Sequence, residues 1–303
     1  NLDIHKGEKV LICGPSGCGK STLFNCLNGL IPASYSGDAT GELIIKGKSY
    51  KDLDIFSLSK ITGTVLQDSD GPFIGLTVGE DIAFAMENDN VQLNEMRERV
   101  IEAAKKVGID SFLNHAPHEL SGGQKQRVSL AGVMVDNVEI FLFDEPLANL
   151  DPASGKKTIE LIDQIYKDTG ATIIIVEHRI EDVLHRSVDR VVLMGEGSII
   201  LDTTPDKLLS SDSLIKNGIR EPLYVTALKY AGVEIKEEMK PGMIDTLILS
   251  DGDKKKVIDW IESVPDKPQM DNRPILLETK NLSFSYPNGK EALKDINFSI
   301  KKG

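Results

Sequence analysis

The chain has 303 residues, of which 40% are hydrophobic and 27% are charged, and its formal net charge at pH 7 is −12. This composition excludes a disordered chain and gives enough length for one large or two smaller folded domains. The negative charge argues against a broad basic face for nucleic acid, although a bound polyphosphate needs only a local positive site.

Short runs rich in Ile, Val and Leu dominate the first two thirds of the chain. Strands are predicted for residues 9–14, 42–47, 63–67, 139–145, 172–178 and 190–194. Because these runs lack polar alternation, each strand is expected to be buried on both faces of a sheet. Helical patterns at residues 94–108 and 151–170 lie between them, the first ending at Gly108 and the second opening with Asp151 as N-cap. Alternating strands and helices predict a parallel α/β sheet.

The pattern changes after about residue 220. Residues 220–233 and 254–264 have helical spacing, and they are separated by a mixed-charge stretch with Pro and Gly. Residues 219–274 are therefore interpreted as a linker with a small accessory element. Residues 276–300 alternate apolar and polar positions around an Asn-Gly turn, which predicts a β-hairpin.

The segment GPSGCGKS, residues 14–21, follows a predicted strand and opens a predicted helix. Backbone N–H groups of such a loop converge on phosphate oxygens, and the helix N-terminus adds partial positive charge. Lys20 is expected to reach the β- and γ-phosphates, and the Ser21 hydroxyl to ligate Mg²⁺. The alternative is a glycine-rich turn that binds nothing; the agreement of strand, glycines, Lys-Ser pair and helix favours the phosphate site.

Two adjacent acids end the predicted strand at residues 139–145. Asp144 is expected to hold a carboxylate near Mg²⁺, through water, and Glu145 to polarise the attacking water as a general base. A solvated acidic loop is the alternative, and the phosphate loop favours the functional interpretation.

The segment LSGGQKQR, residues 120–127, predicts a second anion site. Ser121 and Gln124 form a capping-box pattern, and Gly122 and Gly123 leave backbone N–H groups unobstructed at the positive end of a helix. A capped helix without a ligand is the alternative. One nucleotide does not need two γ-phosphate sites on one chain, unless each site serves a different molecule.

With these motifs in this order, residues 1–218 resemble an ABC-transporter ATPase subunit. The resemblance identifies residues 14–22 as Walker A, Gln67 as the Q-loop, residues 120–124 as the signature, Asp151 as the D-loop and His178 as the switch histidine. It implies a P-loop NTPase fold with a mainly parallel, RecA-like core, an antiparallel β subdomain and an α-helical signature subdomain at about residues 70–135. The implied nucleotide-binding residues are Gly14, Pro15, Ser16, Gly17, Cys18, Gly19, Lys20, Ser21 and Thr22.

In that family two ATPase domains pack head to tail, and each ATP lies between the Walker A loop of one domain and the signature of the other. The resemblance therefore implies ATP and Mg²⁺ as cofactors, with Ser21, Gln67 and Asp144 at the metal. It implies catalysis by Glu145, His178 and Gln67, with His178 contacting the γ-phosphate.

The two ends of the chain are similar, since NLDIHKG at residues 1–7 and NFSIKKG at residues 297–303 share Asn, Ile, Lys and Gly. By the same resemblance, residues 275–303 are the opening hairpin of a second ATPase domain, in which Tyr286 stacks on adenine. The chain is thus interpreted as part of a tandem-fused double ATPase. The first domain then lacks its leading strands and its adenine-stacking aromatic.

The hairpin is hypothesised to fill the vacant sheet edge of the first domain, in the same chain or a neighbouring one, because it would cover an unpaired strand edge. A frayed tail is the alternative. Deleting residues 275–303 is then expected to lower the melting temperature, and an unchanged value would contradict the hypothesis.

Residues 65–84, 176–186 and 220–233 resemble importers of the energy-coupling-factor type, which take up vitamins, such as thiamine or its precursor, and cobalt or nickel ions. After Gln67, only Asp70 matches the family's usual acidic pattern. The implied partners are a second ATPase domain of the same chain or a homodimer mate, a transmembrane coupling subunit and a substrate-binding membrane subunit, at the cytoplasmic face of the membrane; nucleic acid is not expected. The alternatives are a non-transport ABC protein and a nucleotide-binding regulator without turnover.

Overall fold

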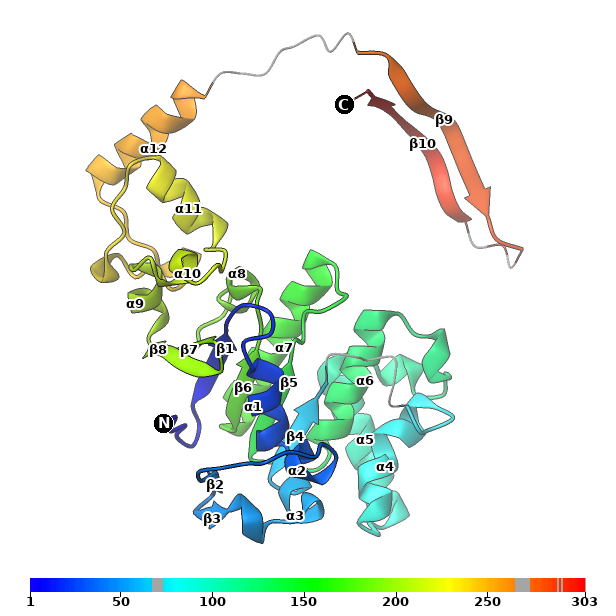
Figure 1. The fold of residues 1–303 in the computed structure, drawn as a ribbon. Helices are drawn as coiled ribbons and strands as arrows, with labels where there is room; N and C mark the ends of the chain where they lie inside the picture. Colours follow the sequence, from blue (N-terminus) through cyan, green and yellow to red (C-terminus); the bar gives the residue numbers. More distant parts are fainter. Residues whose placement is uncertain (67–72, 265–272, 288, 290, 303) are drawn as a thin grey trace. The chain divides into compact units, whose positions relative to one another are not determined.

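The computed structural model describes residues 1–66, 73–264, 273–287, 289 and 291–302. It divides into two units, residues 1–259 and 260–303, and each is described here by itself (Figure 1). The predictions that concern Gln67 and Asp70 lie outside the described residues. Within the described ranges, no helix is long and apolar enough to cross a membrane.

A six-stranded sheet in the order β4-β5-β6-β1-β7-β8 forms the centre of the first unit. Its strands are β1 (Lys9–Cys13), β4 (Thr62–Val65), β5 (Ile140–Asp144), β6 (Thr172–Val176), β7 (Arg190–Gly195) and β8 (Ser198–Thr203). The first five in this order run parallel, and β8 pairs antiparallel with β7. Five of the six predicted strands are confirmed. Because the sheet is parallel here, the carboxyl ends of β1, β5 and β6 meet at one edge.

The prediction for residues 42–47 is wrong. This run forms only β2 (Ile44–Ile45), which pairs antiparallel with β3 (Lys48–Ser49), and Ile44 is 60% exposed. The reason is local: Lys46 and Gly47 have φ values of 51° and 75°, so the chain reverses in a two-residue turn before a longer strand can form.

Helices surround the sheet and extend beyond it. They are α1 (Lys20–Leu27), α2 (Leu30–Ala33), α3 (Ile55–Ser59), α4 (Val78–Asn88), α5 (Leu93–Val107), α6 (Gly122–Met134), α7 (Pro152–Thr169), α8 (Ile180–Val183), α9 (Pro205–Leu209), α10 (Ser213–Lys216), α11 (Leu223–Tyr230) and α12 (Asp251–Ser263). Short 3-10 helices are Tyr50–Asp52, Asp110–Phe112, Pro117–Glu119, Glu237–Met239 and Ile244–Thr246. The predicted ends of α5 and α7 are confirmed: α5 ends at Gly108, and Asp151 caps α7 by accepting from the N–H groups of Ala153 and Ser154.

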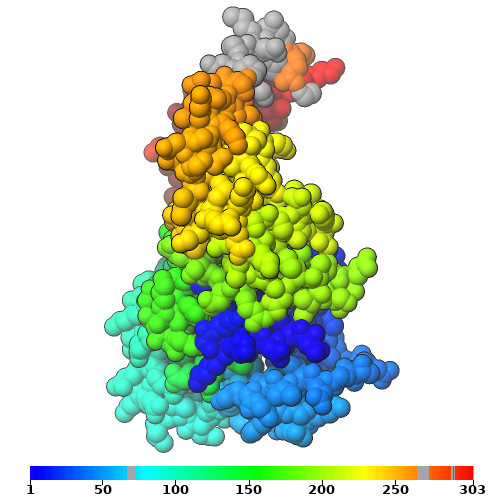
Figure 2. Space-filling model, turned by 90° about the vertical axis from the view of Figure 1, so that its left-hand side faces the viewer, coloured from blue at the N-terminus to red at the C-terminus, as the bar shows by residue number. Residues whose placement is uncertain are grey.

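The helices α4, α5 and α6 pack on one another and form the α-helical subdomain of the first unit. Their contact buries Ile82, Met86, Val100 and Val128. Figure 2 shows α4 and α5 (cyan) beside the segment that carries β2, β3 and α3 (lighter blue). The parallel core, the small antiparallel pair and the helical subdomain confirm the predicted fold class.

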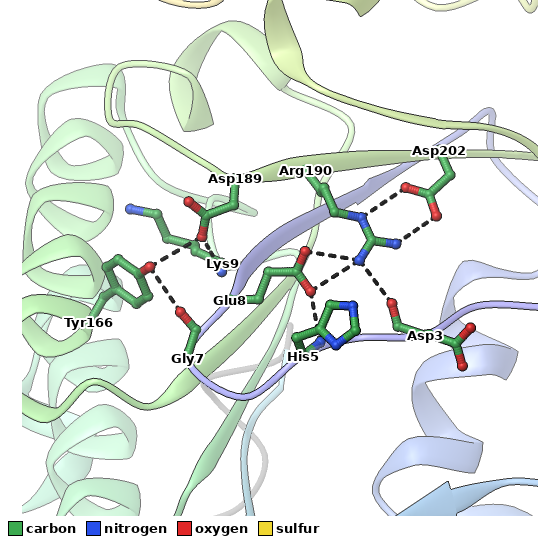
Figure 3. A network of polar contacts seen from close by, with 9 residues as sticks. All are labelled: Asp3, His5, Gly7, Glu8, Lys9, Tyr166, Asp189, Arg190 and Asp202. Carbon is green, nitrogen blue, oxygen red and sulfur yellow. Dashed lines mark hydrogen bonds and ion pairs between the residues drawn. The ribbon is translucent and has the colours of Figure 1, made fainter.

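Polar contacts fix the start of β1 (Figure 3). Arg190, at the start of β7, donates to both carboxylate oxygens of Asp202, at 3.0 and 2.6 Å, and to Glu8 at 2.9 Å. These hydrogen bonds, first with Asp202 and then with Glu8, raise the pKa of Arg190. On the other side of β1, the buried Lys9 ammonium pairs with Asp163 of α7 at 2.6 Å. Together these contacts fix the position of β1 and hence of the loop that follows its carboxyl end.

Residues 219–235, the start of the predicted accessory element, pack within the first unit. Five apolar side chains of this segment are buried in the same cluster as Leu11, Phe143 and Ile175 of the sheet. They are Ile219, Val225, Leu228, Val233 and Ile235. The predicted helices of this region are confirmed as α11 and α12. Burial of these apolar side chains removes them from water and so fixes residues 219–235 within the first unit.

The second unit contains the predicted hairpin, in which β9 (Ile275–Ser285) pairs antiparallel with β10 (Glu291–Lys301). The register shifts at several points, and Asn281 and Asp295 have positive φ values. The rings of Phe284 and Tyr286 lie 5.2 Å apart in an edge-to-face arrangement. Asn288, half of the predicted turn, lies outside the described residues.

Candidate functional site

The loop between β1 and α1 has the shape that the phosphate-loop prediction requires. Gly17 and Gly19 have φ values of 78° and 99°, a left-handed backbone that favours glycine. A Cβ atom at Gly14 would lie 2.4 Å from the backbone oxygen of Met194 and 2.6 Å from the sulfur of Cys18. The glycines therefore allow the loop to fold tightly over the end of the sheet.

Lys20 places its ammonium group inside this loop. Its Nζ atom donates to the carbonyl oxygens of Gly14 and Pro15, at 2.9 and 3.0 Å, and the residue is only 6% exposed. Ser21 and Thr22, at the first positions of α1, are exposed. The loop thus combines a fixed positive charge, an accessible hydroxyl and a helix N-terminus, which is an arrangement suited to phosphate.

Asp144 ends β5 with a carboxylate that lacks a full set of partners. Its Oδ1 atom is buried and has no hydrogen-bond partner among the residues that the structure describes. Burial, and then the neighbouring Glu145, raise the pKa of Asp144 from 3.8 to about 6, although Lys20 acts in the opposite direction. A buried carboxylate oxygen and the Ser21 hydroxyl are hard oxygen donors of the kind that Mg²⁺ prefers, so these residues fit the predicted metal.

Replacing Asp144 by Asn is expected to stabilise the nucleotide-free protein near neutral pH. Because the native pKa of Asp144 is raised from 3.8 to about 6, the native state binds more protons in this window and its stability falls as the pH rises through it. Asn carries no such penalty, so the variant gains on the order of 2 kcal/mol above about pH 6 and loses this advantage below about pH 4. Urea unfolding at both ends of this window measures the difference, and a pH-independent difference would contradict the assignment.

Glu145 and His178 lie close together at the same edge. Glu145 follows β5 and His178 follows β6, and the His178 Nδ1 atom lies 3.9 Å from a Glu145 carboxylate oxygen. The Glu145 side chain is 21% exposed and that of His178 is 57% exposed, so both face the accessible edge. Glu145 has a φ of 46°, a strained conformation for a non-glycine residue, and its N–H donates to Val176 at 2.8 Å.

The predicted signature forms the N-terminus of α6. The Ser121 N–H donates to the Gln124 side chain at 2.8 Å, as the capping box requires. A Cβ atom at Gly122 would meet open space, whereas one at Gly123 would lie 3.8 Å from both Leu150 and Ser154. The exposed Ser121 and Gly122 thus leave the helix end open on one side, and its role as a second anion site stays a prediction.

The remaining predicted residues are not gathered at this edge by described contacts. Asp151 caps α7, and its carboxylate also accepts from the Ser154 hydroxyl at 2.5 Å, a hydrogen bond that lowers the pKa of Asp151. Tyr286 belongs to the second unit, where it is 52% exposed. Gln67 lies outside the described residues.

Three side chains that hold the loop after Glu145 were not predicted from the sequence. The Gln126 amide donates to the carbonyl of Pro146, and the Glu177 carboxylate accepts from the N–H of Leu147 at 3.2 Å. The Arg179 guanidinium donates to the carbonyl of Leu147 at 3.0 Å. The only sequence signal was a carboxylate directly before His178 at the end of a strand.

Comparisons with known proteins agree with this geometry. Residues 1–148 match a family described as ABC transporter, and residues 211–284 match one described as ATP-binding cassette cobalt transporter. Proteins from Clostridium perfringens and Photobacterium profundum, both named as ABC transporter ATP-binding proteins, are 56% and 54% identical over all 303 residues. The chain spans about half the length of these curated relatives, 53% and 54%.

Solved structures are similar as well. A cbiO1 structure from Clostridium perfringens, described as part of the ABC transporter complex cbiONQ, has 33% identity and a TM-score of 0.64, over 76% of this chain and 90% of that chain. A dimeric ATP-binding cassette in a post-hydrolysis state with ADP and Pi has 31% identity and a TM-score of 0.59, over 67% of this chain and 88% of that chain.

Proposed function

The chain belongs to the ABC transporter ATP-binding family, and from this premise we propose that it binds and hydrolyses ATP to power a membrane importer. The observation that carries the proposal is the meeting of three groups at one sheet edge. They are the glycine loop with the enclosed Lys20 ammonium, the unpartnered Asp144 oxygen, and the pair formed by Glu145 and His178.

Each group has a distinct role in the proposed reaction. The loop N–H groups and Lys20 bind the triphosphate, and the Ser21 hydroxyl and Asp144 hold Mg²⁺, which when bound neutralises phosphate charge. Glu145 accepts a proton from the attacking water, and His178 orients the γ-phosphate beside it. Because Glu145 and His178 are already 3.9 Å apart, the proposed catalytic pair needs little rearrangement.

The importer is proposed to be of the energy-coupling-factor type, with a cobalt or nickel ion or a vitamin as its solute. Support comes from the cobalt-transporter match of residues 211–284 and from the likeness to cbiO1, described as part of cbiONQ. The apolar side chains of Ile74 and Leu76 are 64% and 83% exposed, which fits contact with a membrane component. We therefore propose a transmembrane coupling subunit as partner and the cytoplasmic face of the membrane as the location.

The chain is further proposed to be part of a tandem double ATPase. The likeness of residues 1–7 and 297–303, the hairpin of the second unit, and the roughly twofold length of the relatives support this. Residues 1–218 are then one ATPase domain, residues 219–274 connect it, and residues 275–303 open the next. Tyr286 is proposed as the adenine-stacking residue of that next domain.

Expression of the full-length protein with its neighbouring membrane proteins tests the proposal. We expect a membrane complex that hydrolyses ATP and whose turnover depends on Lys20. A protein that hydrolyses ATP but purifies with ribosomes or DNA-repair factors would favour a non-transport ABC protein. A complex that binds ATP without turnover would favour a nucleotide-binding regulator.

A further inference from the structure

Glu177 is a buried carboxylate for which the proposed chemistry has no direct use. It is 0% exposed and lies between the end of β6 and His178. A carboxylate in this position costs several kcal/mol of desolvation unless it accepts well-placed hydrogen bonds. Glu177 accepts them from two separate loops.

One oxygen of Glu177 organises the loop that carries His178. Its Oε1 atom accepts from the backbone N–H groups of His178 and Arg179, at 2.8 and 3.0 Å. The same oxygen lies 3.2 Å from the His178 Nδ1 atom. A carboxylate at this distance orients the imidazole ring and leaves its Nε2 atom for other partners.

The other oxygen reaches the loop that follows Glu145. The Glu177 Oε2 atom accepts from the Leu147 N–H at 3.2 Å, and Arg179 donates to the Leu147 carbonyl at 3.0 Å. Gln126 of α6 donates to the adjoining Pro146 carbonyl. Two residues after Glu145, the backbone is therefore held from the histidine loop and from the signature helix at once.

We propose that Glu177 is a positioning residue for ATP hydrolysis, which fixes Glu145 and His178 relative to each other by holding both of their loops. This inference rests on the proposed function, and it adds a residue whose described hydrogen bonds go to the loops after Glu145 and around His178. Glu145 has a left-handed backbone, with φ at 46°, and such a conformation persists only when its surroundings hold it. Glu177 supplies part of that hold.

The test is Glu177→Gln in the full-length protein. Three donors face the Oε1 position and one faces Oε2, so the amide oxygen takes the first position and its NH₂ group turns toward the Leu147 N–H. The histidine loop then keeps its acceptor, while the loop after Glu145 loses one. We expect kcat to fall about 10–100-fold with the KM for ATP within about twofold.

The matched control is Glu160→Gln. Glu160 also accepts from a His and an Arg, His185 and Arg186, both at 3.1 Å, but among the described residues it has no hydrogen bond to the loop after Glu145. We expect its kcat to stay within about twofold of wild type. A Glu177→Gln enzyme with wild-type kcat, or one whose loss lies in KM instead, overturns the proposal.

Hydrogen exchange at the Leu147 amide tests the proposed role of Glu177 without relying on ATP turnover. The Leu147 amide is expected to exchange at least about tenfold faster in Glu177→Gln than in wild type, while amides of β1 exchange as before. Unchanged exchange at Leu147 overturns the positioning role even if wild-type turnover proves absent. Absent wild-type turnover with faster exchange at Leu147 instead rejects the proposed ATPase function and supports the loop contact.

Discussion

Replacing Glu145 by Gln is expected to lower ATP turnover by about 10²–10⁴-fold, the usual contribution of a positioned general base. Gln has the same shape and keeps the backbone, so the Glu145 N–H still donates to Val176 at 2.8 Å. The amide cannot accept a proton from water, and this is the function assigned to the carboxylate. Lys20 and the glycine loop are untouched, so the affinity for ATP stays within about twofold.

Phosphate release under saturating ATP and binding of a fluorescent nucleotide measure the two quantities for Glu145→Gln. Glu160→Gln again serves as the control, because it removes one carboxylate from the neighbouring α7 without altering the edge of the sheet. A Glu145→Gln enzyme that keeps more than about a tenth of wild-type turnover would place the general base elsewhere.

The strands of the parallel sheet were predictable because burial on both faces leaves an unbroken apolar run. β1 and β6 are buried at every position, and nothing in their sequences needs tertiary context to be interpreted. The run at residues 42–47 also contains consecutive Leu and Ile residues but ends in a Lys46-Gly47 turn. Composition alone does not show that the turn leaves only two residues for β2, so the prediction failed there.

The site was predictable in part for a related reason. Lys20, Glu145 and His178 stand at fixed places relative to strand ends, and a parallel sheet brings those ends together. Gln126, Arg179 and Glu177 act on backbone groups 20 to 32 residues away, at Pro146 and Leu147. A backbone carbonyl or N–H group has no residue type, so apart from the carboxylate directly before His178 no sequence pattern marks these contacts.

Replacing Gly122 by Asp is expected to lower the rate of ATP hydrolysis about 10²-fold or more while leaving the fold intact. In the first unit, a side chain at Gly122 points into open space, and a carboxylate in the first turn of α6 favours the helix dipole. The isolated chain should therefore unfold no more easily than wild type. If the triphosphate of a second ATPase domain docks on this helix end, the added side chain and its negative charge repel it.

Gly132→Asp provides the matched control, because Gly132 lies in the same helix and also borders open space, but away from the N-terminus. Turnover of the full-length protein is expected to fall only in Gly122→Asp, whereas nucleotide binding at the Lys20 loop stays within about twofold in both variants.

The same shared site predicts slow turnover, rising with protein concentration, for residues 1–303 alone. Rapid turnover by residues 1–303 alone at high dilution, with Gly122→Asp in place, would mean that one domain hydrolyses ATP unaided, because a site completed by a second molecule is lost on dilution and a self-contained site is not.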